Sequence, residues 1–110
     1  MYKLKNDKYR RARGGKAFVI SLFCTACESR ILDYQKDGDG TLKRCYLNRI
    51  LAPANLETLQ HDESTKHIKD IPSLLCPGCG EVIGVAIIHH DGRYAFKLRQ
   101  GHFIKKRLTA

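Results

Sequence analysis

Two Cys-x-x-Cys pairs are the residues of this sequence whose types and spacing could do chemistry. They read Cys24-Thr-Ala-Cys27 and Cys76-Pro-Gly-Cys79. Two such pairs in one small domain can supply four thiolates to a tetrahedral metal ion, which is usually zinc. The spacing therefore predicts one structural Zn2+ ion bound by all four of these cysteines.

Two other interpretations of the pairs are weaker. A redox dithiol of the thioredoxin type lies at the start of a helix, whereas the residues after Cys79 have the pattern of a strand. A catalytic zinc ion needs an open coordination position, and four cysteines close the shell. The 48 residues between the pairs exceed the roughly 15–20 of a common short ribbon. This insert must therefore belong to the fold.

The fifth cysteine, Cys45, lies within a predicted strand. A small buried hydrophobe is its simpler interpretation, because free cysteines are often buried. The alternative is a reactive thiol whose pKa is lowered by the charges of Lys43 and Arg44. The histidines have no ligand-spaced pair, so we expect them to be solvated or core residues. They are His61, His67, His89, His90 and His102.

The elements that must position the cysteines are mostly strands. An apolar run at 17–23 leads into the first pair, and 31–35 with 41–47 predict a hairpin around a glycine-rich loop. Segments 81–90, 93–99 and 102–108 predict a meander, with Asp91-Gly92 at its first turn. Between the hairpin and the second cysteine pair we expect a short helix from Pro53 to about Gln60 and a loop over 61–66. We predict a mainly β fold, in which two antiparallel sheets are joined by the zinc ion.

Charge divides the chain unevenly. The net charge is +9, and residues 1–16 contribute seven bases and one acid to it. We therefore expect a basic N-terminal arm over residues 1–16, which can be flexible, and a single zinc-bound β domain over residues 17–110. A basic arm attracts phosphate polymers or acidic surfaces, although a solvated terminus is the simpler interpretation.

Further bases alternate along the last strands, and they suggest a nucleic-acid surface. Phosphate contacts would come from these groups, and Tyr46 or Phe103 could stack on an unpaired base. We favour RNA over duplex DNA because no recognition helix is evident. The simpler alternative is that these charged side chains only form the solvent-exposed face of a sheet. The candidate residues are Arg10, Arg11, Arg13, Lys16, Arg93, Lys97, Arg99, Lys105, Lys106 and Arg107.

No run of about 18 apolar residues is present, and the first residues are charged rather than apolar. We therefore expect no membrane span and no secretory signal. A cytoplasmic location follows as an expectation, because reduced cysteine pairs there bind metal more often than they form disulfides.

The chain resembles small bacterial zinc-ribbon proteins of the zinc-bound β-tent superfamily. That superfamily includes methionine sulfoxide reductase B, Rab exchange-factor-like chaperones, yippee and cereblon domains, and an RNA-sensing helicase domain. The resemblance spans about residues 17–107. It is carried by the two knuckles and by Lys43-Arg-Cys-Tyr-Leu-Asn-Arg-Ile50, Leu75-Cys-Pro-Gly-Cys-Gly-Glu-Val-Ile-Gly84 and Tyr94-Ala-Phe-Lys-Leu98.

The enzymes of that superfamily use cysteines that this sequence lacks. The sulfoxide reductase needs a catalytic cysteine beyond the second knuckle, and no cysteine follows Cys79. The formaldehyde-activating relatives need a second zinc set, which Cys45 alone cannot supply. The resemblance thus implies a non-catalytic module, and we expect it to bind nucleic acid. An acidic protein partner in an assembly is the alternative, and a sensor or enzyme using Cys45 is a minor one. The oligomeric state is open.

Overall fold

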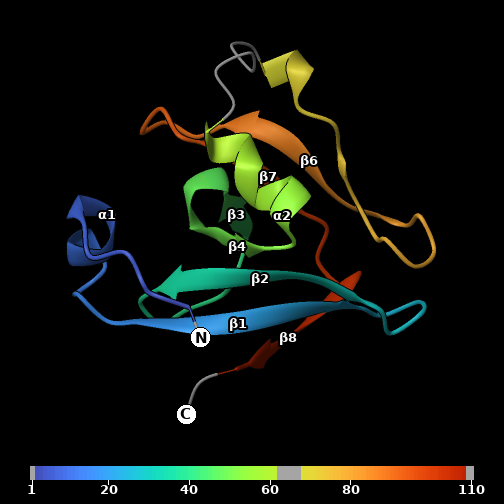
Figure 1. Ribbon diagram of the computed structural model, residues 1–110, viewed down its shortest axis with the longest axis horizontal. Helices are drawn as coiled ribbons and strands as arrows, with labels where there is room; N and C mark the ends of the chain where they lie inside the picture. Colours follow the sequence, from blue (N-terminus) through green and yellow to red (C-terminus); the bar gives the residue numbers. More distant parts are fainter. Residues whose placement is uncertain (1, 62–67, 109–110) are drawn as a thin grey trace.

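The computed structural model describes residues 2–61 and 68–108, and these residues form two four-stranded antiparallel sheets and several short helices (Figure 1). The elements in chain order are α1 (Lys8–Ala12), β1 (Ala17–Cys24), β2 (Arg30–Asp37), β3 (Arg44–Tyr46), η1 (Leu47–Arg49), β4 (Ile50–Ala52), α2 (Ala54–Glu57), η2 (Thr58–His61), η3 (Ile68–Asp70), β5 (Leu74–Leu75), β6 (Val82–Ile88), β7 (Tyr94–Leu98) and β8 (Phe103–Arg107). The predicted fold class, mainly β with two antiparallel sheets, is confirmed.

Sheet A has the strand order β4-β2-β1-β8, and its centre is the β1–β2 hairpin. Both of these strands are buried on both faces over residues 19–22 and 31–36. Apolar side chains such as Leu22 and Leu32 face the second sheet, which we call sheet B. The other face carries Ser21, Asp33 and Gln35, which are polar yet buried. Such groups need hydrogen-bond partners inside the protein.

The N-terminal segment supplies these partners by lying across the outer face of sheet A. The Tyr2 hydroxyl donates to Asp33 over 2.5 Å, and the Lys5 amide donates to the Gln35 side chain over 2.7 Å. Ser21 donates to Asp33 over 2.6 Å. The N-terminal arm therefore contacts the sheet through Tyr2 and Lys5. Helix α1 begins at the Asp7 cap, which accepts from two backbone amides.

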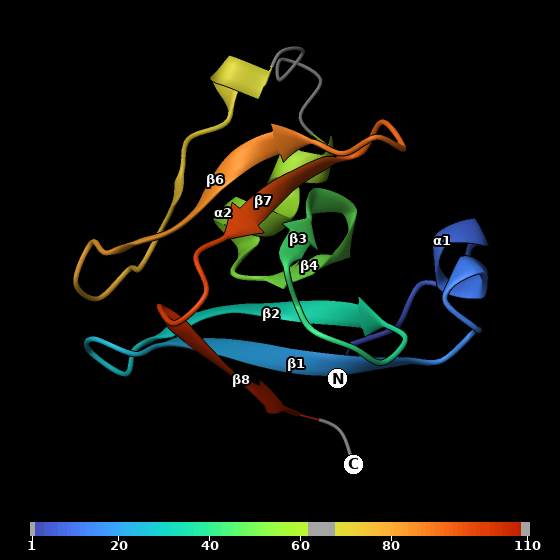
Figure 2. The ribbon, with the colours of Figure 1, turned by 180° about the vertical axis from the view of Figure 1, so that it is seen from behind.

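Sheet B has the strand order β3-β7-β6-β5 and stands over sheet A in both ribbon views (Figure 2). Phe96 of β7 and Ile83 of β6 are at most 1% exposed in the core between the sheets. Lys97 is exposed between the buried Phe96 and Leu98, as the alternation predicts. The β6–β7 hairpin and the short helix after Pro53 are present as predicted.

Two predicted pairings are wrong. Residues 31–47 do not form a hairpin: β2 pairs with β1 and β4 in sheet A, whereas β3 pairs with β7 in sheet B. The last strand also leaves the meander, because β8 pairs with β1. In both places a glycine with a positive φ angle, Gly38 or Gly101, turns the chain from one sheet to the other. Local alternation predicts which residues share a face of a strand, but it does not predict which strand lies alongside.

No helix in the described ranges is long and apolar enough to cross a membrane. Residues 62–66 of the predicted loop, and His67, lie outside the described residues.

Candidate metal centre and basic pocket

The two Cys-x-x-Cys pairs meet where the turn after β1 lies beside the turn after β5 (Figure 1). The four Sγ atoms all lie within 4.8 Å of one another. Cys24 and Cys79 are 3.7 Å apart at Sγ, and Cys27 and Cys76 are 3.5 Å apart. A tetrahedron with metal–sulfur bonds of about 2.3 Å has sulfur–sulfur edges of about 3.8 Å. The cluster therefore fits a metal ion bound by four thiolates.

Each pair sits in the same local turn, which orients its thiols. In the first turn the Glu28 amide donates to the Cys24 carbonyl, and in the second the Gly80 amide donates to the Cys76 carbonyl, both over 2.9 Å. Glu28 and Gly80 both have positive φ angles, of 66° and 80°. The Gly78 amide also lies 3.4 Å from Cys76 Sγ, a contact that stabilises thiolate charge.

The two turns interlock at Gly78. A Cβ atom added there would clash with Ser29 Oγ and lie 3.1 Å from Cys27 Sγ. No larger residue fits without moving the other turn. Glycine is thus required here by close approach, not by its backbone angles.

Electrostatics also favours a cation among the sulfurs. The Ser29 hydroxyl and amide lower the pKa of Cys27 to about 6. The Glu81 amide lowers the pKa of Cys79, but desolvation and the neighbouring cysteines outweigh it and raise that pKa to about 12. Adjacent thiolates repel one another, so all four can ionise together only around a positive ion. Thiolate donors of this kind are the set that zinc prefers.

The fifth cysteine is not part of this cluster. Cys45 is 0% exposed and faces Phe96 across the β3–β7 pair. Burial raises the pKa of its thiol well above the ordinary range. Such a cysteine is a packing residue, because the thiolate is the reactive form.

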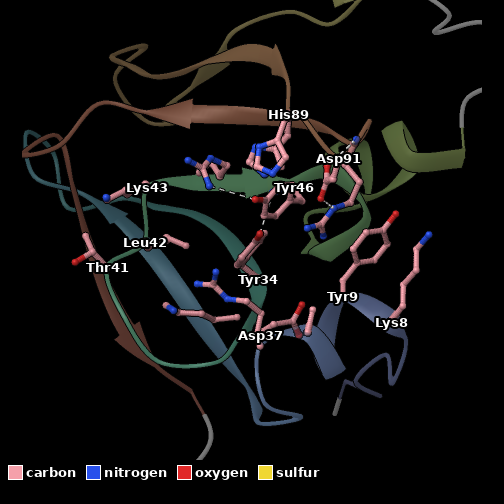
Figure 3. A pocket seen from close by; sticks show the side chains of 16 residues that line it. Lys8, Tyr9, Tyr34, Asp37, Thr41, Leu42, Lys43, Tyr46, His89 and Asp91 are labelled. Atoms are coloured by element: carbon pink, nitrogen blue, oxygen red, sulfur yellow. Dashed lines mark hydrogen bonds and ion pairs between the residues drawn. The ribbon is translucent and has the colours of Figure 1, made fainter.

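A second feature, which we call the basic pocket, lies at the other end of the sheets from the cysteine cluster, beside α1. Its cavity volume is about 860 Å³. Figure 3 shows its walls: Lys8 and Tyr9 come from α1, Tyr34 from β2, Lys43 from the β2–β3 connection, and His89 from the β6–β7 turn. The lining residues are Lys8, Tyr9, Ala12, Arg13, Tyr34, Lys36, Asp37, Thr41, Leu42, Lys43, Arg44, Tyr46, His89, His90, Asp91 and Arg93.

Positive charge dominates this lining. Six lysines and arginines face two aspartates, and both aspartates are already paired. Asp37 accepts from the buried Arg49 over 2.7 Å, and Asp91 accepts from Arg93 over 2.8 Å. Burial lowers the pKa of His89, so this ring is neutral at pH 7.

Stacked rings form one wall of the pocket. The Arg93 guanidinium lies between two aromatic faces, 3.7 Å from the Tyr9 centroid and 3.6 Å from the Tyr46 centroid. His89 meets Tyr46 edge-on with ring centroids 5.3 Å apart, and it lies against His90 at 3.9 Å with the two rings tilted by 47°. This wall ties α1 to sheet B, and it presents π surfaces beside the cations.

The predicted nucleic-acid residues are distributed over several surfaces. Arg13 and Arg93 line the basic pocket. Lys105 and Arg107 lie on β8 opposite Leu22 and Ile20, on the face of sheet A that also carries Lys36. The other six lie outside the lining, and four of these have a partner of their own. Arg10 donates to Gly15, Lys16 pairs with Asp39, Arg99 pairs with Glu81, and Lys106 lies over Phe23, whereas Arg11 and Lys97 are exposed.

Sequence reasoning missed most of the pocket. The sequence gives no binding role to Lys36, Lys43, Arg44, His89 or His90, and it includes Lys8 only as part of the basic arm, whereas Tyr46 is expected as a stacking residue. They come from four segments that converge only in the folded protein. Their one shared signal is the excess of basic residues, which does not say where they meet.

Comparison with known proteins identifies no relative: no family model, no curated protein and no solved structure matches the chain. The resemblance to the β-tent superfamily therefore stays a prediction.

Proposed function

We propose that the protein is a non-catalytic zinc module that binds single-stranded nucleic acid, with RNA favoured, through the basic pocket and the adjoining face of β8. The observation that carries this proposal is the convergence of six lysines and arginines around one cavity. Cations gathered in a concave site raise the local concentration of phosphate polymers.

Zinc has a structural part in this proposal. Cys24 and Cys27 belong to the end of the β1–β2 hairpin, and Cys76 and Cys79 to the β5–β6 hairpin. A metal ion bound by all four joins sheet A to sheet B. The pocket has walls from both sheets, so its shape depends on their relative position.

A strand of nucleic acid could continue from the pocket along β8. Lys105 extends to the Gly40 carbonyl over 3.4 Å, and its charge reaches Lys36 inside the pocket. Arg107 lies over the Phe18 ring at 4.3 Å. Lys105 therefore places positive charge next to the segment that contributes Thr41 and Leu42 to the pocket, and Arg107 lies further along the same face of β8. A flexible single strand can follow such a curved path, whereas a rigid duplex needs a helix or ribbon that fits a groove.

The described helices offer no such recognition element, because α1 has five residues and α2 has four. This supports single strands over duplexes. The absence of catalysis is supported by the closed thiolate set and by the burial of Cys45.

Fluorescence anisotropy with labelled 12-nucleotide RNA, DNA and duplex probes, all without terminal phosphates, tests the proposal. We expect salt-dependent binding to single strands, with a logarithmic slope of about −0.7 for each phosphate neutralised. The variant Lys43→Gln/Arg44→Gln should weaken binding about tenfold or more. Lys106→Gln is the matched control, because that side chain lies on the opposite face of sheet A from Lys105.

Two results would contradict the proposal. One is no binding of any single strand at 50 mM salt, with elemental analysis showing one zinc per chain; selective capture of acidic peptides by the same protein would then point to a protein partner. The other is an equal loss in the control and pocket variants, which would place the binding surface elsewhere.

A further inference from the structure

We propose that the basic pocket binds the phosphomonoester group of a nucleotide, either free or at the end of a strand. This deepens the proposed function, on which it rests for the nucleotide character of the ligand. The evidence that the ligand carries an acceptor-rich anionic group is a set of donors in the pocket that lack acceptors.

The Tyr34 hydroxyl is the first of these donors. Its oxygen accepts from the Tyr46 amide over 2.9 Å, and no described residue accepts its proton. The side chain is 3% exposed and lines the pocket. Burial raises the pKa of Tyr34, so the hydroxyl keeps its proton. A buried hydroxyl without an acceptor is costly, and a ligand oxygen would satisfy it.

The Lys36 ammonium is the second donor, two residues along the same face of β2. It is 5% exposed and donates to the Gly38 carbonyl over 2.9 Å. An ammonium group has three N–H donors, and in the described part of the chain Gly38 supplies the one acceptor. Burial, then Lys105 and Arg13, lower the pKa of Lys36. A buried cation beside other cations favours an anionic ligand.

Arg93 adds a third unsatisfied donor. Its Nη1 atom is buried and has no hydrogen-bond partner among the described residues. Tyr34 and Lys36 belong to β2 and Arg93 to the turn before β7, and all three residues line the cavity. Donors without acceptors are uncommon in native proteins, and three in one basic cavity indicate a missing acceptor-rich group.

A phosphomonoester fits this set of groups. It carries a charge of about −1.5 to −2 at pH 7 and three acceptor oxygens. An internal phosphate of a strand carries one charge and is flanked by sugars on both sides. It therefore reaches a buried lysine such as Lys36 less easily than a terminal phosphate does. The cavity of about 860 Å³ is much larger than a phosphate ion and lies in the range of small-molecule sites. Leu42 and the His90 ring offer apolar and π surface for the rest of a nucleotide.

Calorimetry and amide-shift mapping of the zinc-loaded protein test the inference, with inorganic phosphate, AMP and adenosine as probes. We expect AMP to bind with a Kd below about 1 mM, phosphate to bind more weakly, and adenosine not to bind. Lys36→Met and Tyr34→Phe should each weaken AMP binding about tenfold or more. Lys106→Gln should leave it unchanged. Zinc content and the urea midpoint of each variant show whether it is folded.

Amide shifts of the wild-type protein keep the test independent of any variant. Shifts confined to the pocket residues support the assignment. No AMP binding at 5 mM, shifts elsewhere, or unchanged affinity in both folded variants would overturn it. RNA with a 5′ phosphate, a 3′ phosphate or neither distinguishes the sources: tighter binding of one phosphorylated end indicates a strand end, and AMP binding with no end preference indicates a free nucleotide. The probe with neither phosphate tests the proposed function separately.

Discussion

Replacing Arg49 with methionine should destabilise the protein much more than the loss of an exposed charge. Arg49 is 1% exposed and donates to two carboxylates, to Asp37 over 2.7 Å and to Asp7 over 3.0 Å through Nη1. Asp7 caps α1 and Asp37 ends β2, so one guanidinium joins the N-terminal arm to sheet A. The methionine leaves both carboxylates without their cation.

The magnitude follows from burial. Breaking a buried ion pair costs about 3–5 kcal/mol, because the remaining charge stays desolvated. Asp37 is 9% exposed and carries most of this cost, whereas Asp7 is 36% exposed, so its share is reduced to about 1 kcal/mol by solvent screening. We expect a loss of about 3–4 kcal/mol for Arg49→Met and about 1 kcal/mol for Asp7→Asn.

Urea unfolding of zinc-loaded protein at pH 7 measures these losses. With a slope of about 1.5 kcal/mol per molar urea, the Arg49→Met midpoint should fall by about 2 M or more. The matched control is Arg99→Met, whose pair with Glu81 spans 3.5 Å between half-exposed groups. It should cost less than about 0.5 kcal/mol. Equal midpoints for Arg49→Met and Arg99→Met would refute the argument that the buried pair holds the arm.

The pH dependence of stability tests the Asp7–Arg49 pair a second time. The Arg49 hydrogen bonds lower the pKa of Asp7 from 3.8 to about 2. A lowered pKa stabilises the fold above pH 3.8, and this contribution is lost as the pH falls toward 2. Protonation of the thiolates also releases metal in acid, so wild type and Asp7→Asn are compared at each pH to cancel that effect. Their difference should shrink below about pH 4, and a difference that grows would contradict the assignment.

Three further predictions concern the cysteines and their turns. Gly78→Ala should lower the free energy of unfolding by about 1–3 kcal/mol and speed metal loss to a chelator, because the added Cβ would clash with Ser29 Oγ. Adding Ser29→Gly to this variant should restore part of both properties. If the second substitution restored neither, the two turns would not interlock. Glu28→Gly should raise the free energy of unfolding by about 0.5–1 kcal/mol, because its φ of 66° strains any residue but glycine; a lower urea midpoint would contradict this. Native zinc-loaded protein should show no thiol reactive toward Ellman's reagent, as Cys45 is buried; rapid labelling of Cys45 would revive the thiol-sensor alternative.

The sequence predicted those features that depend on local patterns. Cysteine spacing indicated the ligand set, because a Cys-x-x-Cys turn is built from four successive residues. Alternation identified β1, β6 and β7 nearly to their ends, and Pro53 marked the start of α2. These elements carry their evidence within a few residues.

The features that sequence reasoning missed depend on contacts between distant segments. Nothing near residues 31–47 says that β3 pairs with β7, because an alternating segment fits any sheet edge. Arg49 looks like a surface residue, and its burial depends on Asp7, 42 positions away. The basic pocket likewise needs α1, β2, β3 and the β6–β7 turn in place before its charges meet.

The candidate metal centre and the basic pocket lie at opposite ends of the two sheets, and this separation gives each a distinct part in the molecule. The two cysteine turns lie side by side at one end of the sheets, and α1 lies at the other end (Figures 1 and 2). Beside α1, Arg49 and the Tyr9–Arg93–Tyr46 stack join this helix to both sheets. The core between them is small, and sheets fastened at one end only could change their angle. Tyr34 lies on a strand of sheet A and Arg93 lies in the turn between two strands of sheet B, so their donors can meet one ligand only if that angle is fixed. A metal ion that never touches the ligand would therefore still determine how well the pocket binds it.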